Sequence, residues 1–255
     1  MILNRLGNKS LIAKKIQTHF PKHDIYMEPF FGAGGMYFNK PKAKFNYIND
    51  MDDDVYNLFR QIIDNKDEFV KMLKDIPITE KQFKSWGKGK KEEDDLMNAI
   101  RFIFISNFGL FGKPDTLRIG ATNPKNIVFK NIDKTLDWLD NAYFFNVDFR
   151  KFFGKFYYKD NIARCFCYCD PPYLGTGDNY SDSFVEQDTR DLFQVLMDSK
   201  VKFAVSEFDN GVILDLVEKH GLNLITVGER TNLMNKRTEV LVTNYDSHPT
   251  LFDIL

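Results

Sequence analysis

Short apolar segments alternate with helical patterns along most of this chain of 255 residues. Strand-like segments rich in aromatic and β-branched residues are expected at 25–27, 45–48, 143–146, 165–169, 201–206, 222–227 and 239–244. Helical spacing of apolar side chains is expected at 9–19, 186–199 and 211–220. This alternation predicts an α/β fold, a mostly parallel sheet with helices on both faces. The last two strands are separated only by 228–238, which has no helical pattern, so they should close the sheet as an antiparallel hairpin.

A long interruption follows the second expected strand. Apolar side chains recur at helical spacing from about 52 to 108, and 109–131 is loop-like because it contains Gly109, Gly112, Pro114, Gly120 and Pro124. The sequence therefore predicts one α/β domain made of residues 1–54 and 143–255, with a mainly helical insert at 55–142.

Composition excludes several classes of protein. Apolar residues make up 43% of the chain, which is enough for a sizeable core and excludes a disordered or fibrous protein. The longest segments without a charged residue, 29–39 and 102–112, have 11 residues each, whereas a membrane-spanning helix needs about 18 or more. The first residues carry no secretory signal pattern. We therefore expect a soluble, cytoplasmic protein without a membrane partner. The net charge of −1 argues against a chain that is basic throughout.

The three cysteines, Cys165, Cys167 and Cys169, occupy alternate positions of one expected strand and should share a face. Metal binding is the alternative, but there is no fourth cysteine and the four histidines show no ligand spacing. We therefore interpret the thiols as small buried side chains and predict no metal.

Two features follow the first two expected strands. The segment Phe30–Gly34 is an F-x-G-x-G loop, where glycines allow a sharp turn and close approach to a ligand. Asp50 ends the next strand, where a carboxylate can accept hydrogen bonds from both hydroxyls of a ribose. Taken singly, the loop could be a structural turn and Asp50 a cap for a helix starting near Asp52. Together they predict a nucleoside site, for which NAD and S-adenosylmethionine both qualify.

A third feature, Asp170-Pro171-Pro172-Tyr173, comes directly after the strand at 165–169. Two prolines fix the backbone and remove N–H donors, so the turn presents carbonyl acceptors in a fixed place. Asp170 adds a carboxylate acceptor, and Tyr173 adds an aromatic face. Converging acceptors beside an aromatic ring suit the exocyclic amino group of a stacked base. The alternative is a rigid turn with a solvated aspartate.

These motifs and their order resemble those of Dam-type (D12 class) amino-methyltransferases, which transfer a methyl group from S-adenosylmethionine to N6 of adenine in DNA. Arg5-Leu6-Gly7-Asn8-Lys9 is similar to the N-terminal motif of the family, with Arg5 where an aromatic residue commonly stands. Asp148-Phe149 is similar to the site that lines the adenine of the cofactor, and 235–241 is similar to the closing segment. The resemblance implies a Rossmann-like methyltransferase sheet with an inserted target-recognition domain. It implies catalysis by Asp170, Pro171 and Tyr173, and S-adenosylmethionine binding by Arg5, Lys9, Phe31, Gly32, Gly34, Asp50, Phe149 and Asp170.

The insert is expected to contact DNA. Between 101 and 131 there are five basic residues against one acidic residue, Asp115: Arg101, Lys113, Arg118, Lys125 and Lys130. Basic and amide side chains in a glycine-rich loop suit contacts to phosphates and base edges. The candidate DNA contacts are Asn107, Lys113, Arg118, Asn123 and Lys125. An ordinary polar surface is the alternative.

Other functions remain open at this stage. The acceptor could be cytosine N4 or an RNA adenine, with the same fold and donor. An NAD-dependent oxidoreductase would have a third glycine where this chain has Tyr37. A non-catalytic DNA-binding relic is disfavoured because Asp50 and the whole 170–173 motif are present. The expected partners are double-stranded DNA and a cognate restriction endonuclease; the recognition sequence and oligomeric state are not predicted.

Overall fold

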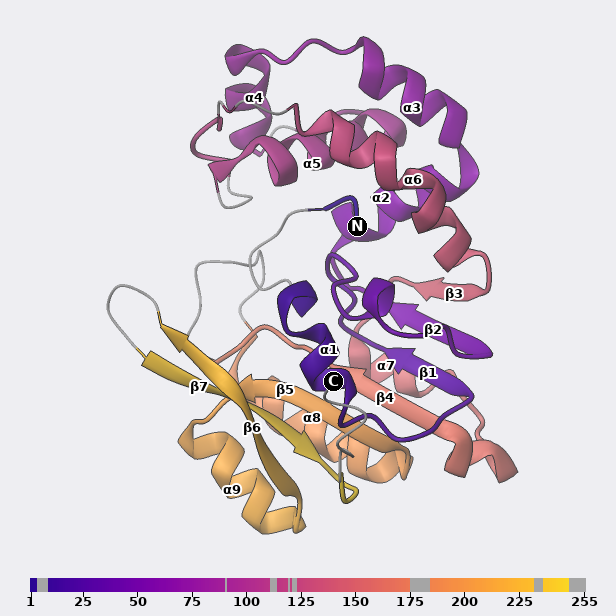
Figure 1. Cartoon of the computed structure of the whole chain (residues 1–255), viewed down its shortest axis with the longest axis vertical. Helices are drawn as coiled ribbons and strands as arrows, with labels where there is room; N and C mark the ends of the chain where they lie inside the picture. The colour runs from indigo at the N-terminus through magenta and orange to yellow at the C-terminus, as the bar shows by residue number, and fades with distance from the viewer. Residues whose placement is uncertain are drawn as a thin grey trace.

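A seven-stranded sheet forms the body of the protein, in the order β3-β2-β1-β4-β5-β7-β6 (Figure 1). The structure, a computed structural model, describes residues 1–3, 9–89, 91–110, 114–118, 120, 123–174, 184–231 and 236–247. The strands are β1 (Ile25–Glu28), β2 (Phe45–Asn49), β3 (Ala142–Phe145), β4 (Cys165–Cys169), β5 (Lys202–Phe208), β6 (Asn223–Thr231) and β7 (Lys236–Thr243). Strands β1 to β5 pair in parallel, and β7 lies antiparallel between β5 and β6. The predicted mostly parallel sheet with a closing antiparallel pair is confirmed.

Helices cover both faces of the sheet, as predicted. On one face lie α7 (Phe149–Phe153), α8 (Glu186–Ser199) and α9 (Gly211–His220), and on the other α1 (Ala13–Gln17) (Figure 1). Strand β4 shows the two faces most simply. Its three cysteines pack on the α7–α9 side, and Phe166 and Tyr168 pack on the other. The thiols are free and at most 1% exposed, so their prediction as small buried side chains is confirmed.

Five helices connect β2 to β3 and gather at one end of the molecule (Figure 1). They are α2 (Asp53–Asp64), α3 (Lys66–Asp75), α4 (Glu80–Gly87), α5 (Asp95–Phe108) and α6 (Lys125–Leu139). Helix α2 begins where the Asp52 side chain accepts a hydrogen bond from Asp54 N, and it buries Val55, Leu58, Phe59 and Ile62 at helical spacing. These side chains belong to the same apolar cluster as Tyr26, Ile48 and Phe166 of the sheet. The helices and one face of the sheet therefore share one core.

Three predicted boundaries are wrong. The loop expected at 109–131 ends early, because α6 begins at Lys125; Pro124 lacks an N–H and is compatible with the start of a helix. The loop expected at 228–238 is mostly strand, since β6 extends to Thr231 and β7 begins at Lys236. The helix expected at 9–19 is a 3₁₀ turn at Lys9–Leu11 followed by the short α1.

Further 3₁₀ turns lie at Tyr37–Asn39 and Lys159–Arg164. In the part of the chain that the structure describes, no helix combines the length and apolarity needed to cross a bilayer.

Candidate active site

The predicted site residues follow neighbouring parallel strands and therefore meet at one edge of the sheet. The glycine loop follows β1, Asp50 follows β2, Asp148 follows β3 and Asp170 follows β4. Asn49, which is 1% exposed, joins three of these strand ends. Its Nδ2 donates to the carbonyls of Pro29 and Val147 at 3.0 and 2.9 Å, and its Oδ1 accepts from Val147 N at 3.0 Å. Sequence analysis did not identify Asn49.

Asp50 is held by backbone donors. Its Oδ2 accepts a hydrogen bond from Gly32 N at 2.6 Å, and its Oδ1 accepts one from Asp52 N at 2.9 Å. The N-cap of α2 is Asp52, so the alternative role of Asp50 as that cap is wrong. The contact with Gly32 brings Asp50 and the glycine loop together.

The glycines of the loop serve different purposes. Gly32 and Gly34 both have positive φ, 54° and 71°. A Cβ on Gly34 would lie 2.3 Å from the Phe38 ring, so the packing of the loop requires glycine there, whereas a Cβ on Gly32 would meet nothing within 4 Å. The Phe31 ring is 2% exposed and packs against Phe38 and Phe59, so a ligand would meet the backbone of Phe31.

Lys9, Asp170 and Tyr173 converge at the opposite end of the site. Lys9 Nζ lies 2.8 Å from Asp170 Oδ1 and 4.4 Å from the centre of the Tyr173 ring. Both Lys9 and Tyr173 also contact Glu239 of β7: Lys9 Nζ lies 3.4 Å from Glu239 Oε1, and the Tyr173 hydroxyl donates to the same oxygen at 3.0 Å. Lys9 is 3% exposed and Glu239 is 2% exposed, so this ion-paired cluster is largely removed from solvent. Pro171 is buried next to Asp170 in the same turn.

A second glutamate fixes the end of the turn. Glu207 of β5 accepts hydrogen bonds from Leu174 N at 3.2 Å and from Phe208 N at 2.7 Å. The Phe208 ring lies edge-on to Tyr173, with 4.7 Å between the ring centres. Sequence analysis missed both Glu207 and Glu239. The signal that could have found them is an acidic residue close to the apolar run of a strand, residues 203–205 for Glu207 and 240–242 for Glu239.

Burial shifts the ionisation of groups around the turn. Burial, with a smaller contribution from the nearby Asp170, raises the pKa of Glu207 to about 8. Glu28, at the end of β1, accepts a hydrogen bond from the Tyr26 hydroxyl at 2.6 Å, and burial raises its pKa to about 8 as well. Burial, followed by Asp170 and Glu239, raises the pKa of Tyr173 well above its usual value. Tyr173 therefore keeps its proton and acts as a hydrogen-bond donor at neutral pH.

Asp148 and Phe149 lie at the start of α7. The Asp148 side chain caps the helix, since Oδ1 accepts from Arg150 N at 2.8 Å. The Phe149 ring is 5% exposed and lies 5.5 Å from Phe30 and 6.2 Å from Phe184, centre to centre. Three aromatic rings from separate segments thus cluster beside the carboxylate.

Two of the predicted DNA contacts are wrong. Asn107 is 2% exposed, and its Nδ2 donates to Ile2 O at 2.8 Å. Lys125 is 6% exposed, and its Nζ donates to the carbonyl oxygens of Lys74 and Ile76 at the end of α3. Side chains so buried hold the helical end together and do not reach a nucleic acid.

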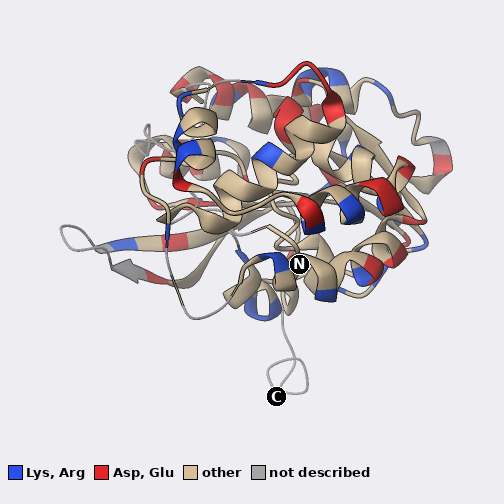
Figure 2. Cartoon of the chain, turned by 90° about the horizontal axis from the view of Figure 1, so that it is seen from above, with Lys and Arg blue, Asp and Glu red and all other residues tan. Residues whose placement is uncertain are grey.

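The local excess of positive charge is also smaller on the surface than in the sequence. Arg101 is 4% exposed and pairs with Asp54, with 2.5 Å between Nη2 and Oδ2. Basic and acidic residues alternate along the helices at this end of the molecule (Figure 2). Arg118 and Asn123 are exposed, and Asn123 Oδ1 accepts from Lys125 N at 3.0 Å. Arg5 and Lys113 lie outside the described residues.

The sheet order, with β7 antiparallel between β5 and β6, is the methyltransferase-like α/β fold that the sequence predicted. A sequence profile of the D12 class N6 adenine-specific DNA methyltransferases matches residues 6–233, and the chain belongs to this family. The predicted resemblance is confirmed. The chain is an adenine-specific DNA methyltransferase, and its methyl donor is S-adenosylmethionine.

Named relatives agree with the family. The chain is 23% identical over 242 residues to the DNA adenine methylase of Escherichia coli K12, covering 87% of this chain and 85% of that protein. It is 27% identical over 209 residues to the retron Ec67 DNA adenine methylase of Escherichia coli, covering 76% and 71%. It is 24% identical over 269 residues to the type II methyltransferase M1.LlaDCHI of Lactococcus lactis subsp. cremoris, covering 94% and 93%.

Proposed function

We propose that this protein methylates N6 of an adenine that is flipped out of double-stranded DNA and held at the 170–173 turn. The observation that carries this proposal is the cluster of Lys9, Asp170, Tyr173 and Glu239 at the carboxyl end of β4. It fixes one carboxylate and one aromatic ring side by side, which is what an exocyclic amine on a stacked base requires.

The arrangement of residues fits S-adenosylmethionine. Asp50 would hold the ribose hydroxyls, because its backbone hydrogen bonds with Gly32 and Asp52 fix a carboxylate beside the open side of Gly32. Phe149 would line the adenine, and Asp170 with Lys9 would hold the charged amino-acid end. When bound, the cofactor supplies an electrophilic methyl group.

The residues of the turn have separate tasks in the transfer. Asp170 and the Pro171 carbonyl would each accept a hydrogen bond from one N–H group of the target amine. They would also stabilise the positive charge that develops on its nitrogen. Tyr173 would stack on the flipped base, with its ring orientation set by the hydrogen bond to Glu239. Lys9 would keep Asp170 in place through its ion pair. Positioning and electrostatics then supply most of the acceleration.

The helical connection at 55–142 is the proposed target-recognition domain, joined to a catalytic domain of residues 1–54 and 143–255. Arg118 and Asn123 remain candidate DNA contacts because both are exposed on the segment between α5 and α6. Lys113 belongs to the same segment. A cognate restriction endonuclease is a proposed partner, supported by the type II methyltransferase among the relatives. The DNA substrate supports a cytoplasmic location.

Transfer of a labelled methyl group from S-adenosylmethionine to DNA and RNA, followed by nucleoside analysis, tests the proposed function. The expected product is N6-methyladenine in double-stranded DNA, with no label in RNA. The Asp170→Asn variant is the control, because any label that it still transfers does not depend on the 170–173 turn. Label in N4-methylcytosine, in RNA or in single-stranded DNA alone would contradict the proposal.

A further inference from the structure

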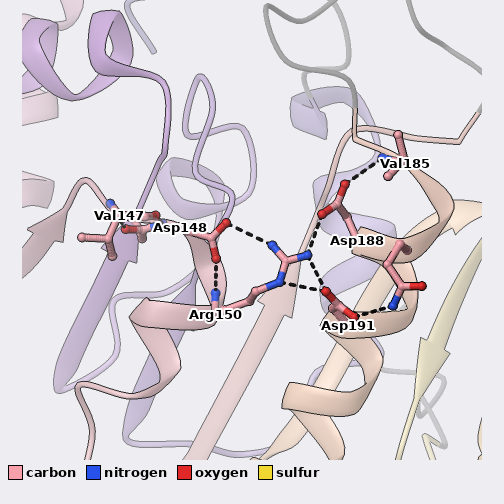
Figure 3. A network of polar contacts seen from close by, with 8 residues as sticks. Val147, Asp148, Arg150, Val185, Asp188 and Asp191 are labelled. Carbon is pink, nitrogen blue, oxygen red and sulfur yellow. Dashed lines mark hydrogen bonds and ion pairs between the residues drawn. The ribbon is translucent and has the colours of Figure 1, made fainter.

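Arg150, the second residue of α7, is the centre of a network of ion pairs between α7 and α8 (Figure 3). Its Nη1 lies 3.1 Å from Asp148 Oδ2, and its Nη2 lies 2.6 Å from both Asp188 Oδ1 and Asp191 Oδ2. Its Nε donates to the same Asp191 oxygen at 3.0 Å. One guanidinium therefore contacts three carboxylates, and its planar fork of donors holds them in fixed directions, which the compact ammonium of a lysine would not.

Arg150 holds both oxygens of Asp148. Oδ1 accepts from the Arg150 backbone N at 2.8 Å, and Oδ2 accepts from the guanidinium (Figure 3). The guanidinium carbon also lies 4.3 Å from the centre of the Phe149 ring. A single residue thus fixes the direction of the Asp148 carboxylate and packs on the adjacent aromatic ring.

The network also reaches the segment that carries Phe184, which forms an aromatic cluster with Phe30 and Phe149. Asp188 uses its second oxygen, Oδ2, to accept from Val185 N at 2.9 Å. Val185 follows Phe184, whose ring lies 5.9 Å from Phe30 and 6.2 Å from Phe149. Arg150 therefore connects the carboxylate, the Phe149 ring and the segment that carries Phe184.

We propose that Arg150 is a positioning residue for the adenine of the cofactor: it holds Asp148 so that the carboxylate accepts a hydrogen bond from the 6-amino group of that adenine. This inference rests on the proposed placement of the adenine at Asp148-Phe149. Each carboxylate oxygen has two lone pairs, so an oxygen bonded to Arg150 can accept from a ligand as well. Without the Arg150 guanidinium, Asp148 would keep the backbone hydrogen bond at Oδ1 but lose the contact that fixes Oδ2, and it would face Asp188 and Asp191 without the positive charge between them.

Binding of S-adenosylhomocysteine and of its hypoxanthine analogue, measured by calorimetry, tests the inference without methyl transfer. The analogue replaces the 6-amino donor by an oxygen, which a carboxylate repels. A hydrogen bond to a charged acceptor corresponds to about a 10- to 150-fold difference in Kd, so the wild type should prefer S-adenosylhomocysteine by about that factor. Arg150→Ala should reduce the preference to less than about threefold, and Arg150→Lys should retain part of it.

Arg190→Ala is the matched control. Arg190 lies on α8, is 39% exposed and pairs with Glu186 at 2.7 Å, and it has no contact with Asp148 or Phe149 in the described structure. This variant should keep the full preference. Thermal unfolding of each variant separates loss of the α7–α8 connection from loss of positioning, and Arg150→Lys supplies the binding comparison if Arg150→Ala does not fold.

An unchanged preference in folded Arg150 variants would overturn the inference, as would an equal loss in Arg190→Ala. A wild-type protein that binds both compounds equally would overturn it too, while leaving cofactor binding intact. Absence of any S-adenosylhomocysteine binding to the wild type would contradict the proposed site as a whole.

Discussion

At Asp50 the carboxylate is held by backbone N–H groups of two nearby segments, whereas at Asp170 the carboxylate is held by the side chain of Lys9, which Glu239 shares. The first end of the site, at Asp50, depends on the backbone path of the loops that contain Gly32 and Asp52. The second requires the N-terminal segment, the turn after β4 and strand β7 to meet. We infer that substitutions at the first end act mainly on cofactor affinity, and that substitutions at the second act on rate and folding together.

The largest effect is expected for Asp170→Asn. The amide keeps the shape of the side chain but removes the charge that faces the developing positive charge, and losing one such preorganised contact costs about 10²- to 10³-fold in rate. Single-turnover methylation at saturating cofactor measures it. A rate near that of the wild type would remove the distinction between the two ends.

Asp50→Ala should weaken S-adenosylmethionine binding with little change in the single-turnover rate at saturation. Hydrogen bonds to a charged acceptor contribute about 1.5–3 kcal/mol, equivalent to roughly a 10- to 150-fold rise in Kd. Calorimetry measures the affinity. If the Kd is unchanged, Asp50 does not hold the ribose.

Tyr173→Phe keeps the stacking ring but removes the donor that Glu239 accepts. We expect the free energy of unfolding to fall by about 1.5–3 kcal/mol, because the buried Glu239 carboxylate loses one of its hydrogen bonds while it keeps its ion pair with Lys9. Tyr173→Ala should in addition lose stacking worth about 1–3 kcal/mol per base, seen as weaker DNA binding. A double-mutant cycle with Glu239→Gln isolates the pair, and a coupling energy of zero would show that the hydroxyl does not position the ring.

Glu28 should make stability depend on pH. Burial raises its pKa to about 8 in the folded protein, whereas the unfolded chain loses this proton near the ordinary value of 4.5. The folded state therefore binds the extra proton, and the free energy of unfolding should fall as pH rises from about 4.5 to about 8, by up to about 1.4 kcal/mol per pH unit for one group. Denaturation at several pH values should give a flatter profile for Glu28→Gln. Glu218→Gln, at an exposed position of α9, should match the wild type.

The smallest effect is expected at the helical end. Arg118→Ala should reduce the salt dependence of DNA binding by about one unit of slope if Arg118 contacts a phosphate. Lys125→Ala should instead lower stability without changing that slope, because Lys125 binds carbonyls at the end of α3. If Lys125→Ala reduces the salt dependence and Arg118→Ala does not, Lys125 and not Arg118 contacts the DNA.

The sequence predicted the strands and the order of the site because both depend on local pattern. Apolar runs marked β4, and the glycine loop, Asp50 and the 170–173 turn each follow a strand, so sheet topology brought them to one edge. The burial of Asn107 and Lys125 was not predictable in this way. A polar residue on a helix gives no local sign that it satisfies a backbone carbonyl elsewhere in the fold.

The sequence also did not predict which side chains pair with the site residues. Lys9 and Asp170 lie far apart in the sequence, and Glu239 gave no signal except its place directly before the apolar run at 240–242. The same holds for Arg150, whose partners on α8 are separated from it by β4 and the 170–173 turn. Pairing of this kind follows from packing, which single-sequence patterns do not encode.

The apolar cluster shared by the sheet and helices α2 to α6 limits how specificity can be redesigned. Transplanting residues 55–142 from a relative would place foreign side chains against Tyr26, Ile48 and Phe166, so a chimera would have to rebuild its own interior before it could recognise a new site. New specificity should be reached more directly by changing surface positions and leaving this buried apolar cluster unchanged. The proposed recognition domain should therefore change only together with the sheet that it packs against, and we expect that it cannot be exchanged as an independent unit.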